Sequence, residues 1–271
     1  MMMVKAIVIG GAGKMGSRII NLISATDGIE LVGAVERKGH PFVGKDVGEQ
    51  IGLGTIRVAI DDDLESCIDK GDVVIDFSHH DAVVGHIKIA AEHTKAMVIG
   101  TTGLTAEETD QIRNLSKTTK VVQAPNMSVG VNVMFKILDY VAGILGDDFD
   151  VEIVEAHHNL KKDAPSGTAV KMAQIIAERL GRDLGTDAVY ERKGMIGART
   201  KKEIGLQTLR AGDIVGEHTV MFGGIGERLE FIHRAHSRDN FAKGAIMAAK
   251  WVVNQGNGFF DMQDVLGLRE S

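Results

Sequence analysis

The segment 155–169, EAHHNLKKDAPSGTA, brings together more titratable and hydroxyl side chains than an ordinary loop does. A histidine such as His157 suits proton transfer near neutral pH. A lysine such as Lys161 suits the binding of a carboxylate, or the stabilisation of negative charge that develops on a substrate. These residue types predict acid–base chemistry on a small anionic substrate. The alternative is a structural histidine whose ring nitrogens are hydrogen-bonded within the protein, beside two lysines exposed to solvent.

The second half of this segment predicts a helix start that could bind a carboxylate. Ser166 is a suitable N-cap, and Gly167 and Thr168 would add free backbone N–H groups and a hydroxyl. An ordinary capped helix is the alternative. Because neighbouring strand residues point to opposite faces, His157 and His158 are not expected to bind one metal together.

Residues 10–16, GGAGKMG, are the second group with a chemical role. Gly11, Gly13 and Gly16 fit the G-x-G-x-x-G fingerprint, and they lie between a predicted strand and a predicted helix. In that fingerprint the first glycine permits the tight turn, the second lets backbone approach a pyrophosphate, and the third lets the helix pack on the strand. The pattern therefore predicts a dinucleotide site, and a purely structural glycine turn is the alternative.

An acid at the end of the second predicted strand completes the fingerprint. Glu36 ends LVGAVE, 20 residues after Gly16, and its carboxylate can accept hydrogen bonds from ribose hydroxyls. Arg37 follows, and its guanidinium could pair with the 2′-phosphate of NADP. The two residues together predict that both NADH and NADPH are accepted.

Two later strand ends extend the predicted cofactor site, because ligands of open α/β sheets bind beyond the carboxyl ends of the strands. Their small and hydroxylated residues would allow close approach of a nicotinamide ring and its ribose, although plain turn chemistry explains them equally well. The predicted contacts are Gly100, Thr101, Thr102, Ala124, Pro125, Asn126 and Met127.

The elements that must position these residues form an α/β protein. Up to about residue 125, apolar runs typical of buried parallel strands alternate with helical patterns, which predicts a Rossmann-like, doubly wound parallel sheet. We expect a dinucleotide-binding domain over 1–126 plus 241–271. A smaller α+β domain for substrate binding and tetramerisation is expected over 127–240, with strands of antiparallel pattern from 204 onward. The stretch 63–71 predicts a short helix, and 182–203 predicts a loop.

Composition is consistent with a cytoplasmic enzyme acting on a small molecule. The chain has 271 residues and a net charge of −6, which argues against a nucleic-acid footprint. Its one cysteine, Cys67, cannot form an internal disulfide, which fits a reducing compartment. The N-terminus lacks the features of a signal peptide, and no apolar run approaches the ~20 residues of a membrane helix.

The motifs together resemble the dihydrodipicolinate reductase family. The resemblance covers nearly the whole chain, and its most specific part is the pattern E-A-H-H-x-x-K-x-D-A-P-S-G-T-A. The other segments that carry it are GGAGKMG, GTTG, NMSVGVNV, RAGDIVGEHTVMF, GERLEFIHRAHSRDNFAKGA and FDMQDVLGL.

The resemblance implies a role for each matching position. His157 would be the catalytic acid/base, Lys161 the proton donor or charge stabiliser, and His158 a substrate contact. Gly167 and Thr168 would receive a substrate carboxylate. The implied cofactor contacts are Gly10, Gly11, Ala12, Gly13, Lys14, Met15, Glu36, Arg37, Gly100, Thr101, Thr102, Ala124, Pro125, Asn126 and Met127.

The resemblance also implies a reaction and an assembly. Hydride would pass from NADH or NADPH to C4 of 4-hydroxy-tetrahydrodipicolinate or its dehydrated form, in lysine and diaminopimelate biosynthesis. Family members are typically homotetramers assembled through the sheet of the second domain. This chain departs from the family pattern after Ser78, where SHHDAV lacks an expected proline, which would alter the loop near the nicotinamide.

Three other hypotheses are weighed against this one. Another two-domain dehydrogenase, such as homoserine or diaminopimelate dehydrogenase, would share the first domain but not the His-His-Lys segment. A dinucleotide sensor without chemistry would not need His157 and Lys161. A metal site at His233 and His236 is disfavoured, because no cysteine or carboxylate cluster accompanies them, and no metal is expected.

Overall fold

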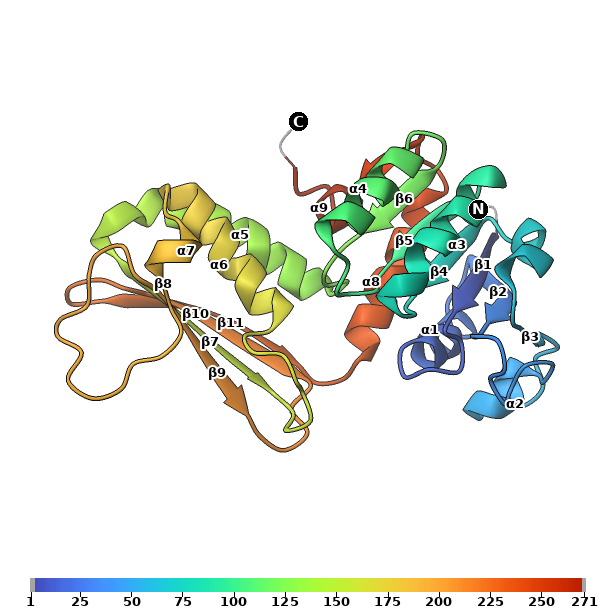
Figure 1. The fold of residues 1–271 in the computed structure, drawn as a ribbon, viewed down its shortest axis with the longest axis horizontal. Helices are drawn as coiled ribbons and strands as arrows, with labels where there is room; N and C mark the ends of the chain where they lie inside the picture. The colour runs from blue at the N-terminus through green and yellow to red at the C-terminus, as the bar shows by residue number, and fades with distance from the viewer. Residues whose placement is uncertain (1–2, 270–271) are drawn as a thin grey trace. The chain divides into compact units, whose positions relative to one another are not determined.

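The computed structural model describes residues 3–269 and shows two compact units (Figure 1). The first unit comprises the residues up to Val129 together with those from Arg238 onward, and the second comprises Gly130–Ser237. The observed division thus falls after Val129, where 126 was predicted, and after Ser237, where 240 was predicted.

A seven-stranded parallel sheet forms the centre of the first unit, in the order β12-β6-β5-β4-β1-β2-β3. This order, in which the chain moves outward from β1 in both directions, is that of a Rossmann-like doubly wound sheet, so the predicted fold class is confirmed. The strands are β1 Val4–Ile9, β2 Ile29–Val35, β3 Ile60–Asp61, β4 Val73–Asp76, β5 Ala96–Ile99, β6 Lys120–Gln123 and β12 Gly258–Phe260.

Helices cover both faces of this sheet because its strands are apolar on both sides. Ala6 and Val8 of β1 belong to one core cluster with α1 and α8, whereas Ile7 and Ile9 belong to another with α3 and α4. The helices of this unit are α1 Gly16–Ile23, α2 Val47–Ile51, α3 His80–Glu92, α4 Ala106–Leu115, α8 Asp239–Val252 and α9 Met262–Val265.

Some of the local predictions for the first unit are confirmed and others are wrong. The capping box at the start of α4 is confirmed, since Thr105 and Glu108 each bond the other's backbone N–H. The helix predicted over 63–71 is wrong in type, because the chain there forms two 3₁₀ turns, η1 Leu64–Ser66 and η2 Ile68–Lys70. Short elements with too few residues to show a period, among them α2, β3 and β12, were not predicted.

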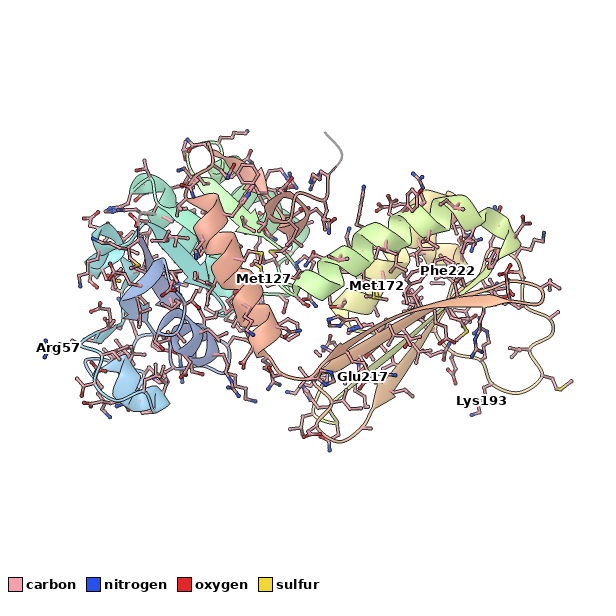
Figure 2. All side chains as sticks on the ribbon, turned by 180° about the vertical axis from the view of Figure 1, so that it is seen from behind. Arg57, Met127, Met172, Lys193, Glu217 and Phe222 are labelled. Atoms are coloured by element: carbon pink, nitrogen blue, oxygen red, sulfur yellow. The ribbon has the colours of Figure 1, made fainter. Side chains whose placement is uncertain are left out.

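The second unit is a five-stranded mixed sheet, in the order β11-β10-β7-β9-β8, with α5 and α6 packed on one face. Met172 of α6 and Phe222 of β10 lie in the core between helices and sheet (Figure 2). The elements are α5 Val129–Leu145, η3 Gly146–Asp148, β7 Asp150–His157, α6 Gly167–Leu180, α7 Leu184–Asp187, β8 Ala188–Val189, β9 Ile204–Arg210, β10 Gly216–Gly223 and β11 Arg228–Ala235.

The antiparallel prediction for this sheet is wrong for one strand. β10 pairs antiparallel with β7 and β11, but β9 runs parallel to β7. The chain passes from β7 through α6 before it returns as β9, and such a crossover leads to a parallel neighbour. The loop predicted over 182–203 also contains α7 and the short strand β8.

The prediction that no segment approaches the length of a membrane helix is wrong for α5. Val129–Asp148 is long and apolar enough to cross a membrane by length and composition alone, although no apolar run of that size was expected. Core helices meet the same criterion, and Val131, Phe135 and Leu138 of α5 are buried in the core of the second unit.

Candidate active site

His157 is the last residue of β7 and points to the same face of the sheet as the core residue Ile153. Its Nδ1 donates a 2.5 Å hydrogen bond to Oε2 of Glu155, two residues earlier on that face. Gly216 of β10 lies beside the other ring nitrogen, since a Cβ there would stand 3.0 Å from His157 Nε2. The glycine thus leaves room around the nitrogen that does not contact Glu155.

Glu155 is the centre of the hydrogen-bond network at this strand end. Its carboxylate, 1% exposed, also accepts two hydrogen bonds from Arg210, at 2.8 and 2.9 Å, and one of 3.0 Å from the backbone N–H of Ser166. Burial by itself raises the pKa of Glu155, but the hydrogen bonds from His157, Arg210 and Ser166 outweigh it and lower the pKa to about 2. Glu155 is therefore an ionised carboxylate, which can accept hydrogen bonds but cannot donate them.

A second histidine, His218 of β10, packs against the first. The two rings meet edge to face with centroids 5.3 Å apart, and His218 is 3% exposed. Burial, together with the nearby charge of His157, lowers the pKa of His218 to about 3, so this ring is neutral at physiological pH. Its Nε2 lies 3.1 Å from Oγ of Ser166.

Ser166 is the N-cap of α6, as predicted, and its Oγ accepts from the N–H of Ala169 at 3.3 Å. Gly167 and Thr168 therefore lie in the first helical turn, and Gly167 is exposed, with open space where a side chain would be. The structure thus brings the start of α6 to the histidines through Ser166, which bonds both Glu155 and His218.

Lys161 lies in the loop between β7 and α6. Its Nζ pairs with Asp163 at 2.8 Å, its side chain is 21% exposed, and its charge contributes to the lowered pKa of His218. Arg210 ties the same loop to the network, since its Nη2 donates to the carbonyl oxygen of Asp163 at 2.6 Å. His158 follows the end of β7 and is half-buried.

Sequence reasoning missed Glu155, Arg210 and His218 as parts of this site. Glu155 is the first residue of the pattern that carries the family resemblance, and its spacing places it on the face of His157, because strand residues two apart share a face. Arg210 and His218 come from strands that follow a helix and a long connection, so no local pattern links them to His157.

In the first unit, the predicted glycine turn lies between β1 and α1, but the glycines divide their roles differently from the prediction. Gly10, not Gly11, takes the left-handed conformation with φ of +73°. Gly11 instead packs beside Ala34 and Ile20. A Cβ at Gly16 would overlap the backbone of Gly10, so close packing at the helix start requires glycine.

The predicted acid reaches this turn. Glu36, directly after β2, accepts a hydrogen bond from the backbone N–H of Ala12 at 3.0 Å. Arg37, Gly13 and Lys14 are exposed, whereas Met15 packs partly against the core. The turn, the acid and the arginine are therefore adjacent at the carboxyl edge of the sheet.

The remaining predicted cofactor residues follow β5 and β6 at the same edge. Thr102 and Pro125 are exposed there, and Gly100 is half-buried against the ring of Phe77. Ala124 and Met127 are 3% and 2% exposed and belong to the core. Their side chains are therefore turned away from any ligand, which leaves them only backbone groups to offer.

A buried aspartate that sequence reasoning missed organises this edge. Asp76 ends β4 and is fully buried; its carboxylate accepts from the N–H of Ser78 at 2.8 Å and from His86 Nδ1 at 2.7 Å. Thr101 also donates to it at 3.3 Å. The hydroxyl of Thr101 therefore fixes the turn after β5 to the end of β4.

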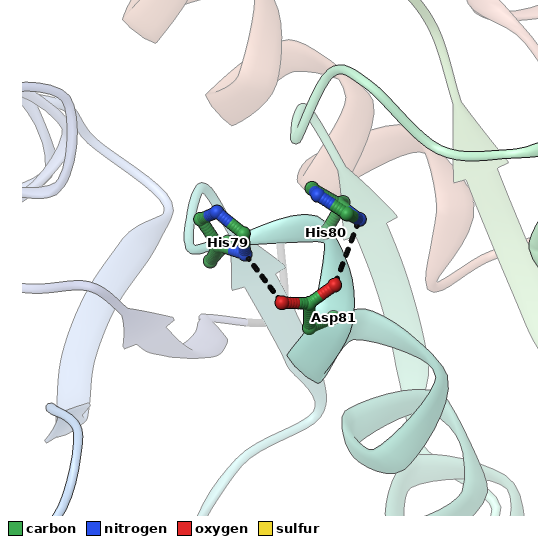
Figure 3. A group of neighbouring side chains, drawn as sticks. All are labelled: His79, His80 and Asp81. Atoms are coloured by element: carbon green, nitrogen blue, oxygen red, sulfur yellow. Dashed lines mark ion pairs between the residues drawn. The ribbon is translucent and has the colours of Figure 1, made fainter.

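The segment that departs from the family pattern forms a small cluster of two histidines and an aspartate (Figure 3). Asp81 pairs with His79 at 3.2 Å and with His80 at 3.1 Å, one carboxylate oxygen to each ring. His80 also approaches Glu108 of α4 at 3.5 Å. Asp81 lies in the first turn of α3, where the helix dipole favours an anion.

Comparison with known proteins places both units in one family. The model described as dihydrodipicolinate reductase, N-terminus, matches residues 4–127, and that for the C-terminus matches residues 130–266. A 4-hydroxy-tetrahydrodipicolinate reductase of Syntrophus aciditrophicus (strain SB) is 63% identical over 98% of this chain and 100% of its own. One from Geotalea uraniireducens (strain Rf4) is 57% identical over the same shares.

Solved structures agree with this placement. A dipicolinate-bound dihydrodipicolinate reductase from Paenisporosarcina sp. TG-14 has a TM-score of 0.76 and 27% identity, covering 97% of this chain and 99% of that one. An amine dehydrogenase from Mycobacterium smegmatis, with a TM-score of 0.59 and 15% identity over 94% of both chains, shares the fold alone. The family models account for nearly the whole sequence, and this chain belongs to the dihydrodipicolinate reductase family.

Proposed function

We propose that this chain catalyses the NADH- or NADPH-dependent reduction of 4-hydroxy-tetrahydrodipicolinate in lysine and diaminopimelate biosynthesis. One observation carries the proposal: a family match along both units coincides with a histidine, His157, that is oriented by a buried carboxylate beside a helix start. The other two-domain dehydrogenases are set aside, since relatives at 63% and 57% identity carry the reductase name.

The glycine turn of the first unit fits a dinucleotide. Gly10 has a positive φ and Gly16 packs against its backbone, so the turn is tight, and the exposed Gly13 offers bare backbone to a pyrophosphate. Glu36 would accept hydrogen bonds from the adenosine ribose, and Arg37 would pair with the 2′-phosphate of NADPH. When bound, NADH or NADPH supplies a hydride to C4 of the substrate.

The second unit would hold the dicarboxylate substrate. One carboxylate would lie at the first turn of α6, where Gly167 and Thr168 offer N–H groups, a hydroxyl and the positive end of the helix dipole. Lys161 would exchange its partner Asp163 for the substrate, and so stabilise the negative charge that develops toward C3 and the ring nitrogen. His158 would contribute a further polar contact.

His157 would carry out the proton transfer. It would deliver a proton at C3 after hydride arrives at C4, either directly or through water, and it would assist the loss of water from the 4-hydroxy compound. The neutral ring of His218 supports this role, because it lies beside His157 without adding a second positive charge.

Assembly and location complete the proposal. The face of the second sheet opposite α5 and α6 carries Leu209 and Ile232, which are 54% and 48% exposed, and a homotetramer would cover them. The cytoplasm is the proposed location, because a biosynthetic reductase works where NADH and NADPH are replenished.

A coupled assay tests the function. The substrate is formed in situ from pyruvate and aspartate semialdehyde by its synthase, and loss of absorbance at 340 nm is followed with NADH and with NADPH separately. Oxidation that requires the synthase and both precursors is expected, and the two rates give the cofactor preference. A protein that binds either nucleotide but oxidises neither would contradict the proposal and favour a dinucleotide sensor.

A further inference from the structure

The buried carboxylate of Glu155 has contacts that a purely structural ion pair would not need. Its two oxygens accept five hydrogen bonds: two from Arg210, and one each from His157, Ser166 and Thr208. The Arg210 guanidinium alone would neutralise the charge. The bonds to His157 and Ser166 instead connect the carboxylate to the proposed proton-transfer group and to the helix start that would bind the substrate.

The direction of the bond to His157 is fixed by chemistry. An ionised carboxylate has no proton to donate, so the imidazole must donate from Nδ1. A neutral imidazole carries one proton, and its placement on Nδ1 leaves Nε2 with the lone pair. The space beside Nε2 is kept open by Gly216.

The surroundings favour an orienting role over a role as a base. Arg210 holds both oxygens of Glu155, at 2.8 and 2.9 Å, and the carboxyl is 1% exposed, so a substrate cannot reach it. The His218 ring, from the neighbouring strand β10, packs against His157 edge to face. The imidazole is therefore held by two contacts, a hydrogen bond and a ring contact, while Gly216 leaves room at Nε2.

We propose that Glu155 is a positioning residue that holds His157 in the tautomer protonated on Nδ1, so that Nε2 exchanges the proton with the substrate. The same carboxylate fixes the N-cap Ser166, and it thereby sets the distance between the proton-exchanging ring and the carboxylate seat at α6. The proposal deepens the proposed reductase function and rests on it for its kinetic test.

The chain contains a matched control. Glu152 lies three residues earlier on β7, on the opposite face, and is bound by Arg192 at 2.9 and 2.8 Å and by Arg199 at 3.2 Å. It is thus a second arginine-paired glutamate of the same strand without contact to a histidine. Glu152→Gln therefore shows how the loss of an arginine–glutamate pair on β7 affects folding when no histidine is involved.

The kinetic experiment compares Glu155→Gln with Glu152→Gln in the full chain. Glu155→Gln is expected to lower kcat about 10- to 100-fold, the usual effect of losing an orienting partner, while the Kd for NADH stays within twofold. Glu152→Gln should keep the wild-type kcat within twofold.

Glu155→Asp guards against a variant that does not fold. It keeps the charge for the long Arg210 side chain but withdraws the oxygen from the His157 ring, so kcat should still fall about tenfold or more. Wild-type kcat in Glu155→Asp, or in a folded Glu155→Gln, would overturn the proposal.

A spectroscopic measurement separates this proposal from the proposed function. In protein labelled with ¹⁵N-histidine, long-range ¹H–¹⁵N spectra report the tautomer of each ring, and His157→Gln identifies the signals of His157. An Nδ1–H tautomer in the wild type that is lost in Glu155→Gln supports the role of Glu155 even if no reductase activity is found. An Nε2–H tautomer in the wild type would refute it.

Discussion

At the scale of single residues, the second unit gives two neighbouring histidines opposite tasks. His157 has a carboxylate on one nitrogen and open space at the other, which suits a group that gains and loses a proton. His218 is buried beside it, and burial is the main cause of its pKa of about 3. One ring is equipped for proton exchange, and the other stays neutral and holds Ser166.

Replacement of His157 by glutamine should separate chemistry from cofactor binding. We expect kcat to fall at least about 100-fold, since general acid–base catalysis contributes on that order, while the Kd for NADH stays within twofold. Steady-state kinetics and nucleotide titration measure the two quantities. His93→Gln, a change at the end of α3, is the control with unchanged kcat. An equal loss of NADH affinity in His157→Gln would argue against its role.

The buried titratable groups predict a loss of stability in acid. His218 has a folded pKa of about 3, below its ordinary 6.5, so the unfolded chain binds the extra proton between these values. The free energy of unfolding should fall below pH 6.5, at roughly 1 kcal/mol per pH unit. Glu155 adds to the loss below pH 4.5, because its pKa drops to about 2 on folding.

Urea unfolding at pH 7.5, 6.5 and 5.5, at one protein concentration, measures this dependence. His218→Asn removes the titrating ring, so its stability should vary less over this range than that of the wild type. Equal pH dependence in the two proteins would show that His218 is not the group responsible.

At the scale of elements, both candidate sites lie where strands end and helices begin. The turn between β1 and α1 depends on Gly16, whose missing side chain lets the helix start meet the backbone of Gly10. The loop between β7 and α6 is instead held by side chains, since Arg210 binds both Glu155 and the carbonyl of Asp163. The glycine turn thus depends on a position without a side chain, Gly16, whereas the loop between β7 and α6 depends on the side chains of Arg210 and Glu155.

Gly16→Ala should damage the first site specifically. The added Cβ would displace the backbone of Gly10, so we expect a loss of about 1–3 kcal/mol in stability and at least tenfold weaker NADH binding. Gly85→Ala in α3 is the matched control, because open space surrounds that position. It should gain roughly 0.5–1 kcal/mol from the better helix propensity of alanine. Thermal unfolding and NADH titration compare them; an unaffected Gly16→Ala would contradict this account of the turn.

At the scale of the whole molecule, the second sheet is covered by helices on one face, whereas the other presents apolar side chains. Leu209 and Ile232 point away from α5 and α6, as alternation along β9 and β11 requires. Exposed apolar side chains on a sheet face are typical of an interface between subunits.

Ile232→Lys should therefore disrupt the proposed tetramer. A lysine buried in such an interface would lose its hydration without gaining a partner, so light scattering after gel filtration should show smaller species at micromolar concentration. Met247→Lys, at a similarly exposed apolar position of the first unit, should leave the mass unchanged. A tetramer that survives in Ile232→Lys would place the interface elsewhere.

Much of this architecture could be predicted from the sequence, because it depends on local signals. Periodicity located the strands and helices of the parallel sheet, and single residues such as Ser166 and Thr105 marked helix starts correctly. The direction of β9 could not be read, because alternation shows the face of a strand and not its partner.

The surroundings of the candidate residues were harder to predict than the residues themselves. His157 and Lys161 were proposed from a single segment, whereas the partners of Glu155 come from residues 53 and 55 positions later, Thr208 and Arg210. Similarly, Met127 is a predicted cofactor contact because it follows a strand, and its buried side chain leaves only its backbone to meet a ligand. Such outcomes depend on tertiary packing that no short pattern encodes.

The helix α8 has a consequence for how the chain is made. It comes after the whole second unit in the sequence, yet Ala242, Ala245 and Ala249 fill the core beneath the parallel sheet of the first unit. During synthesis, one face of that sheet must therefore wait for residues 239–252, while Gly130–Ser237 have already left the ribosome. The unit that begins first is the one whose folding finishes last.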